Sequence, residues 1–355
     1  MKKVFLAFSG IRGKATNGTN YSGNTLSCWR LNHPTVSEFI TAIKKEIPPH
    51  PNIKDDFYET TDSNASFGLT EALWADALWG ILVIDKSGDS YTDLFDRALF
   101  LANIFSPDFL YPIFYISDFG VHKVGHTKKL LENKAHARFH NQDKFSLFAT
   151  KNADDFFELL LEPAGYASTS ADRSRNWDRE GWRIFAASIL FDGLKQYDNS
   201  KTLFSWQREA ADMSAIYEAL CVPETGSIKY RLQKRGPILL EPLGLEEIED
   251  DLGYLYNLRS DFVHGSFGDR LSKDNKNGSW GWDESITKDF DFLGKQSRII
   301  RFSFAGYLKL KNELGTRFNP HKDVVSILEK AILNVPIRNN LHASVREIYS
   351  LMSPV

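Results

Sequence analysis

Residues 256–265 of this sequence are Tyr256-Asn257-Leu258-Arg259-Ser260-Asp261-Phe262-Val263-His264-Gly265, and they end a helical pattern. The apolar residues of this pattern recur every three or four positions: Ile248, Leu252, Leu255, Leu258 and Phe262. Such spacing predicts a helix with one buried face. Gly265 suits the left-handed residue that commonly closes a helix. We therefore expect a helix near 248–262 that packs on other helices and carries polar residues at its end.

Two of those polar residues, Arg259 and His264, indicate phosphate chemistry. The planar guanidinium group of arginine donates parallel hydrogen bonds to two phosphate oxygens. Histidine exchanges protons near neutral pH. An RNA phosphodiester that is cleaved by its own 2′-hydroxyl needs these two groups and neither a metal nor another cofactor. As a pair, the two residues predict RNA cleavage.

The spacing of Arg259 and His264 restricts how they can meet. Five positions of a continuous α-helix rotate the chain by about 500°, which leaves roughly 140° between the two side chains. The two share a face only if the helix ends between them, so that His264 swings free at the helix end. Alternatively, arginine and histidine from two copies of the chain meet across a two-fold axis. The sequence leaves both arrangements open.

The rest of the second half is also predicted to be helical. Further apolar faces fall near 184–194, 213–220, 228–240, 286–312 and 322–333, and a mixed tail follows them. Helices that share one core form a bundle. We therefore predict an all-α helical bundle over residues 171–355.

Residues 1–170 are predicted to form an α+β domain. Short apolar runs predict strands at 4–8, 78–85, 110–117 and 145–150. Helical spacing predicts a helix that begins at Pro34 and others at 91–105 and 153–161. Residues 9–25 are rich in Gly, Asn, Thr and Ser and are expected to form a loop. The polar stretch 166–176 has almost nothing to bury, and the domain boundary is placed there.

The composition is that of an ordinary globular protein. The 355 residues are 42% hydrophobic and 25% charged, and the formal net charge of −3 excludes a global basic field that would attract nucleic acid. The 13% of aromatic residues are expected in large cores. The two cysteines, Cys28 and Cys221, form neither a disulfide framework nor a zinc ribbon, which fits a reducing cytoplasm. No uncharged run approaches the ~18 residues of a membrane span.

Three segments, in order along the chain, resemble a known family. Residues Leu255 to Gly265 resemble the signature of the HEPN superfamily, in which four to six residues separate an arginine from a histidine. The resemblance is closer to the Apea-like HEPN branch, whose helix commonly closes with an Arg-Ser … Val-His-Gly segment. Upstream, Tyr230-Arg231-Leu232 with Arg235, and Glu218-Ala219-Leu220 before them, resemble two further helices of that branch. The resemblance covers roughly residues 180–330.

The resemblance implies a function as well as a fold. HEPN domains are helical bundles that dimerise and act as metal-independent ribonucleases, many of them in toxin–antitoxin and anti-phage defence. By position, Arg259 would hold the scissile phosphate and His264 would act as base or acid, while Asp261 would orient a side chain or stay structural. Ser260 stands where many members have Asn, Asp or His, and is taken as a further RNA contact. The implied partners are RNA, a second copy of the chain, and an antitoxin or a phage-derived activator.

Structural explanations of the same residues compete with this hypothesis. Arg259 could pair with Glu218 or Asp261 and brace the bundle, and His264 could be a helix-terminal residue stabilised by the helix dipole. The protein would then be a non-catalytic RNA-binding, adaptor or regulatory protein. A further alternative is a ligand-sensing protein whose function lies mainly in the first domain, which is expected to be a sensor or regulator.

Two groups of basic residues are weaker signals. Lys229, Arg231, Lys234 and Arg235 lie on a predicted helix of the same bundle and either line an RNA groove or solvate that helix. Residues 122–140 carry several lysines and histidines, which favours a solvated face over an RNA-contacting one. His122 and His126, like His136 and His140, are four positions apart, but no carboxylate or cysteine completes a zinc set nearby. No metal is therefore expected.

Overall fold

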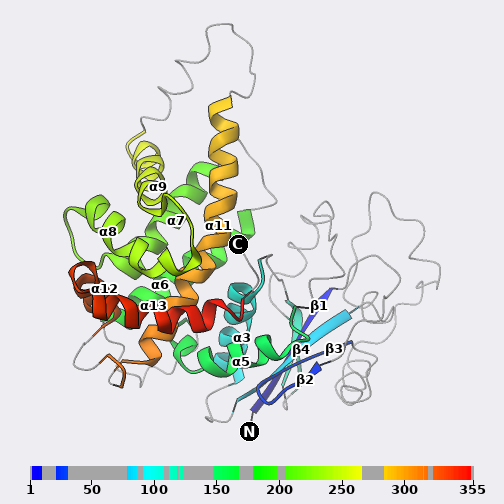
Figure 1. The fold of residues 1–355 in the computed structure, drawn as a ribbon. Helices are drawn as coiled ribbons and strands as arrows, with labels where there is room; N and C mark the ends of the chain where they lie inside the picture. The colour runs from blue at the N-terminus through cyan, green and yellow to red at the C-terminus, as the bar shows by residue number, and fades with distance from the viewer. Residues whose placement is uncertain are drawn as a thin grey trace, which may run out of the picture. The chain divides into compact units, whose positions relative to one another are not determined.

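The structure is a computed structural model that describes residues 2–9, 21–30, 78–85, 91–107, 112–117, 120–123, 147–167, 179–197, 205–265, 284–314, 316–318 and 323–352. The described residues up to Leu161 form one compact unit, and those from Glu162 to Ser350 form a second. The first unit combines a sheet with helices, and the described elements of the second are all helices (Figure 1). The predicted succession of an α+β region and a helical bundle is confirmed. The domain boundary predicted between residues 170 and 171 lies outside the described residues.

The first unit is built on an antiparallel sheet. Its described strands are β1 (Lys2–Ser9), β2 (Tyr21–Ser22), β3 (Leu26–Arg30), β4 (Leu78–Asp85), β5 (Pro112–Ser117) and β6 (Gly120–Lys123), in the order β2-β3-β4-β1-β5-β6. Val4 of β1 lies opposite Val83 of β4, and Leu6 lies opposite Ile81. All four side chains are buried. The predicted buried first strand is thus confirmed, as are the strands expected at 78–85 and 110–117.

Two helices supply the aromatic part of this unit's core. Helix α3 (Tyr91–Phe105) contacts β1, β4 and β5, and it also contacts α5 (Lys151–Leu160). The ring centroid of Phe105 lies 5.3 Å from that of Phe148 and 5.1 Å from that of Phe156. Tilted ring pairs at such distances stabilise a core beyond their buried area. Both predicted helices are confirmed here, and these aromatic side chains are core residues as expected.

The strand predicted at 145–150 is wrong. Residues 147–150 form a turn that leads into α5. The hydroxyl of Thr150 accepts a hydrogen bond from the Ala153 N–H at 3.2 Å and donates one to the Leu147 carbonyl at 2.9 Å. These bonds make Thr150 the N-cap of α5, because its side chain satisfies a backbone donor that the first helical turn leaves unpaired.

Asp154 explains a strand that the sequence did not predict. Its carboxylate accepts hydrogen bonds from the backbone N–H groups of Asn24, Thr25 and Leu26 at 3.0, 2.8 and 2.7 Å. These bonds hold the turn between β2 and β3, which occupies part of the expected loop 9–25. The partners lie about 130 positions apart in the chain, so no local pattern shows them.

The second unit contains the helices that the apolar faces predicted. They are α6 (Arg179–Tyr197), α7 (Ser205–Cys221), α8 (Ile228–Leu240), α9 (Ile248–Val263), α11 (Glu284–Asn312) and α12 (Val324–Leu333), with the short 3-10 helices η4 (Pro163–Ala167) and η5 (Glu241–Leu243). The expected mixed tail is instead a helix, α13 (Val335–Tyr349). Asn334 separates it from α12 and caps it by accepting a hydrogen bond from the Ile337 N–H at 3.1 Å. Pro336 lies in its first turn, where a missing N–H costs nothing.

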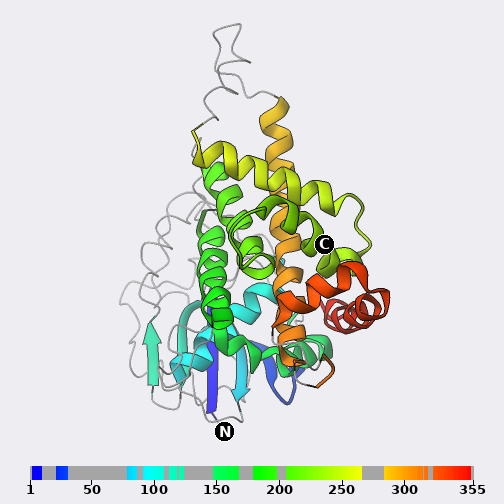
Figure 2. The ribbon, with the colours of Figure 1, turned by 90° about the vertical axis from the view of Figure 1, so that its left-hand side faces the viewer.

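Helix α7 is central to the packing of this unit, because it contacts α6, α9 and α11 (Figure 2). Helix α8 packs between α9 and α12. It comes very close to α9 at Gly236, where an added Cβ would collide with the side chain of Leu252. The absence of a side chain at Gly236 thus makes room for Leu252 between the two helices.

The helix expected from Pro34 lies outside the described residues.

Replacing Asp154 by alanine is expected to destabilise the first unit by about 1–3 kcal/mol for each backbone donor that it leaves buried without a partner. Urea unfolding followed by circular dichroism measures this change. Asp155→Ala is the control, since Asp155 is the next residue of α5 and pairs with the exposed Lys151. If Asp154→Ala unfolds at the same urea concentration as this control, Asp154 does not stabilise the turn between β2 and β3.

Candidate functional site

Helix α9 buries the apolar face that the sequence predicted. Ile248, Leu252, Leu255 and Leu258 are buried, and the helix contacts both α7 and α8. The next residue of the predicted stripe, Phe262, is 36% exposed, so the buried stripe ends one turn early. The last turn of α9 therefore presents apolar as well as polar side chains at the surface.

The end of α9 confirms one expectation and overturns another. Gly265 has a φ of +72°, the left-handed conformation predicted for it. However, the helix continues to Val263, and the His264 N–H still donates to the Ser260 carbonyl at 3.0 Å. The helix therefore does end between Arg259 and His264, but His264 keeps right-handed backbone angles and does not swing free of the helical path. On an ideal helical path, five positions leave about 140° between two residues around the helix axis.

Arg259 is held on its helix by neighbours from α7 and α9. Its Nε lies 3.7 Å from Oε1 of Glu218, and the two side chains are 28% and 17% exposed. The Ser214 hydroxyl, one turn earlier on α7, donates to the same carboxylate oxygen at 3.0 Å. The guanidinium carbon lies 5.7 Å from the ring centroid of Tyr256, within range of a cation–π contact. The ion pair with Glu218 that the structural alternative anticipated is present.

His264 has a different environment. It caps α9 with φ −91° and ψ 0°, and the residue is exposed. Its neighbour Val263 is 56% exposed. Ser260 and Asp261, the other two residues of the predicted site, are both half-buried. An exposed imidazole at a helix end can reach a ligand without rearrangement of the bundle.

Three cations of α8 make polar contacts at the bundle surface. Lys229 Nζ donates to Asn257 Oδ1 of α9 at 3.0 Å. Lys234 Nζ lies 2.6 Å from Oε1 of Glu249. Arg231 Nη1 lies 3.2 Å from Glu224. All three cations are half-buried, and such surface pairs are worth little stability because water screens them.

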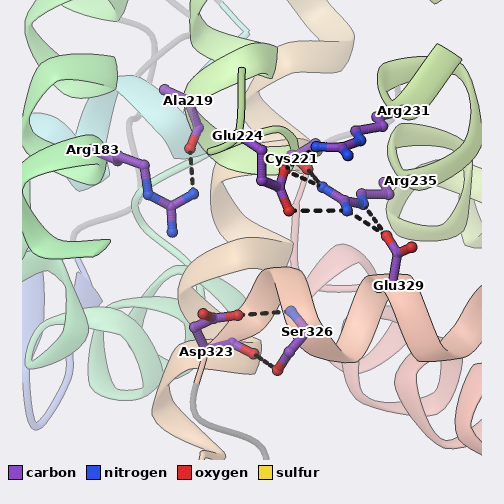
Figure 3. A network of polar contacts seen from close by, with 9 residues as sticks. All are labelled: Arg183, Ala219, Cys221, Glu224, Arg231, Arg235, Asp323, Ser326 and Glu329. Atoms are coloured by element: carbon purple, nitrogen blue, oxygen red, sulfur yellow. Dashed lines mark hydrogen bonds and ion pairs between the residues drawn. The ribbon is translucent and has the colours of Figure 1, made fainter. Parts of the chain in front are cut away.

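Arg235 differs from these three because its side chain is only 5% exposed (Figure 3). It donates to Glu224 at 2.8 Å and to the Cys221 carbonyl at 3.0 Å, and it also pairs with Glu329 of α12. This hydrogen bonding holds the pKa of Glu224 below its ordinary value. Arg235 thus joins the end of α7, the start of α8 and α12, and this structural role does not place it in an RNA groove.

Two contacts around Arg259 were not predicted from the sequence: Tyr256 with Arg259, and Ser214 with Glu218. Tyr256 lies three positions before Arg259 on α9, a spacing that brings side chains together on a helix. Ser214 lies four positions before Glu218 on α7 and could have been found in the same way. What could not be found from local spacing is which face of α7 meets α9.

The described part of the chain contains neither a metal-binding cluster nor a membrane-spanning helix. No group of three or more His, Cys, Asp and Glu side chains is placed there to hold a metal ion. Among the described helices, none combines the length and the apolar character needed to cross a bilayer. Of the basic stretch 122–140, only His122 and Lys123 belong to the described residues, where they lie in β6.

Comparisons with protein-family models, with curated proteins and with solved structures find no match to this chain.

Replacing Arg235 by alanine should lower the free energy of unfolding by about 1–3 kcal/mol, because the Cys221 carbonyl loses its buried donor and the packing of the arginine stem is lost. Thermal unfolding monitored by circular dichroism measures the change. Lys234→Ala, next to it on α8, is the matched control and should unfold like the wild type. Equal melting temperatures for both variants would show that the network around Arg235 is not structural.

The stabilising effect of Arg235 should also depend on pH. Since the folded protein holds the pKa of Glu224 below 4.5, this contribution is complete above pH 4.5 and is lost as the pH falls through the lower folded value. The stability difference between wild type and Arg235→Ala should therefore narrow in acid. Denaturant unfolding at pH 7 and at pH 3.5 tests this, and a difference that widens in acid would contradict it.

Proposed function

We propose that the protein is a metal-independent endoribonuclease of HEPN type. The proposal rests on the end of α9. There, Arg259 is a partly exposed cation held by Glu218, and His264 is an exposed imidazole five positions further on. The two groups supply phosphate binding and proton transfer, which are the two catalytic functions that cleavage by the 2′-hydroxyl requires. The resemblance of three sequence segments to the Apea-like HEPN branch supports the same proposal.

The geometry of α9 favours a site made by two copies of the chain. In a continuous helix, Arg259 and His264 of one copy lie about 140° apart around the axis, so the helix face alone does not bring them to one phosphate. A two-fold axis near the end of α9 would bring His264 of one copy toward Arg259 of the other. Phe262 and Val263 are exposed beside both residues and offer apolar surface for such a dimer.

The reaction then needs no other group. His264 removes the proton of the 2′-hydroxyl, and the oxygen attacks phosphorus. The bond to the 5′-oxygen breaks, and a second histidine, from the other copy, protonates this leaving group. A 2′,3′-cyclic phosphate and a 5′-hydroxyl result. Arg259 stabilises the charge on the phosphorane, and Lys229, Arg231, Lys234 and Ser260 are further candidate RNA contacts.

An RNA cleavage assay in EDTA tests the function. The wild type should cleave RNA, leave cyclic-phosphate ends and spare DNA of the same sequence. His264→Ala and Arg259→Ala should each be at least about 10²-fold slower, since each removes proton transfer or charge stabilisation. Arg208→Ala is the matched control, because Arg208 is an exposed arginine of α7 and pairs with Asp212 at 3.8 Å. Cleavage at the wild-type rate by both site variants would contradict the proposal.

A second candidate is a non-catalytic RNA-binding or adaptor bundle. The observation that favours it is that Arg259 pairs with Glu218 of α7, so this arginine can brace the bundle without a phosphate ligand. Binding of fluorescent RNA separates the two candidates. An adaptor would bind RNA, leave it intact for hours in EDTA, and bind it equally well with His264→Ala.

The wider roles implied by the resemblance belong to the same proposal. A ribonuclease of this kind would serve in anti-phage or toxin–antitoxin defence in the cytoplasm. An antitoxin or a phage-derived activator would then control it, with the first unit as sensor or regulator.

A further inference from the structure

We propose that Glu218 and Ser214 of α7 are positioning residues, which aim the guanidinium group of Arg259 at the scissile phosphate. This inference rests on the proposed ribonuclease function. It starts from one contact, the 3.7 Å approach of Arg259 Nε to Glu218 Oε1. In this contact the carboxylate meets the Nε side of the guanidinium group. Arginine has five N–H donors in a fixed plane, so the two terminal nitrogens keep four donors for a ligand.

The carboxylate is itself held in place. The Ser214 hydroxyl donates to Oε1, the same oxygen that faces Arg259 Nε. Ser214 is fully buried, and Glu218 is only 17% exposed. The hydrogen bond from this buried hydroxyl therefore restricts the rotation of the carboxylate independently of its contact with Arg259.

Tyr256 restricts the guanidinium group from a second side. Its ring centroid lies 5.7 Å from the guanidinium carbon of Arg259. Between the carboxylate at Nε and the ring beside it, a long side chain loses much of its rotational freedom in the folded protein. The arginine side chain therefore loses its conformational entropy when the protein folds and not when RNA binds. This lowers the free energy of the transition state relative to that of the free enzyme and RNA.

A bracing role alone would make a different prediction. An ion pair between partly exposed groups contributes little to stability, about 0–1 kcal/mol. A positioning role acts on the rate of the chemical step. Removal of a positioning carboxylate should therefore lower kcat. It should leave substrate affinity unchanged or slightly improved, because the carboxylate repels phosphate. The split between kcat and KM therefore distinguishes the two roles.

The test uses the full chain with RNA as substrate. Glu218→Gln should lower kcat by about 10-fold without raising KM, since the amide keeps the shape but loses the charge that holds Arg259. Ser214→Ala should lower kcat less, by about 3-fold, because it removes only the restraint on the carboxylate. Asp212→Asn is the matched control, since Asp212 also lies on α7, is 18% exposed and pairs with an arginine at 3.8 Å. This variant should cleave RNA like the wild type.

A second readout links the effect to Arg259 itself. Arg259→Lys keeps a positive charge but has no Nε for Glu218 to meet. Adding Glu218→Gln to Arg259→Lys should change kcat by less than about 2-fold, because the effects of substitutions at two interacting residues do not add. The same 10-fold loss in both backgrounds would overturn the positioning role.

The outcomes separate this inference from the proposed function. If the wild type does not cleave RNA, both the ribonuclease function and the positioning role are rejected. If the wild type cleaves RNA and Glu218→Gln matches Asp212→Asn in kcat, only the positioning role is overturned. A Glu218→Gln protein that fails to fold would shift the decision to Ser214→Ala, whose unchanged kcat would also reject the inference.

Discussion

The burial of one leucine stripe fixes the rotation of α9, and the candidate site depends on that rotation. Leu252, Leu255 and Leu258 pack against α7 and α8. Each fully buried leucine contributes about 1.5–3 kcal/mol, whereas a partly exposed ion pair contributes about 0–1 kcal/mol. The leucines therefore decide which way the helix turns. The pair between Arg259 and Glu218 follows from their packing and does not cause it.

Buried polar contacts then determine which helices become neighbours. Glu180 of α6 accepts hydrogen bonds from the Tyr307 hydroxyl at 2.8 Å and from the Val324 N–H at 3.1 Å, and it pairs with Lys311. Burial and the nearby Glu180 charge raise the pKa of Tyr307, so its hydroxyl stays protonated and can donate. Arg235 joins α7, α8 and α12 in a similar way. Breaking such contacts leaves buried groups unpaired, which penalises other helix arrangements.

Local sequence patterns predicted the elements whose residues depend on near neighbours. The helix α9, the strand β1 and the left-handed Gly265 all agree with the pattern around them. The errors occurred where a distant or single residue decides the structure. Strand β3 follows a turn held by Asp154, which lies about 130 positions further along the chain. Helix α13 was missed because Asn334 alone ends one helix and caps the next.

Sequence patterns were sufficient to predict the helical character of the second unit, the apolar face of α9, and a polar end of this helix with Arg259 and His264. Periodicity is a property of neighbouring residues and can be found without a fold. The assembled bundle was needed to bring Glu218 of α7, whose carboxylate Ser214 holds, to Arg259 of α9. This contact joins separate helices, and packing fixes it only once the whole bundle is assembled.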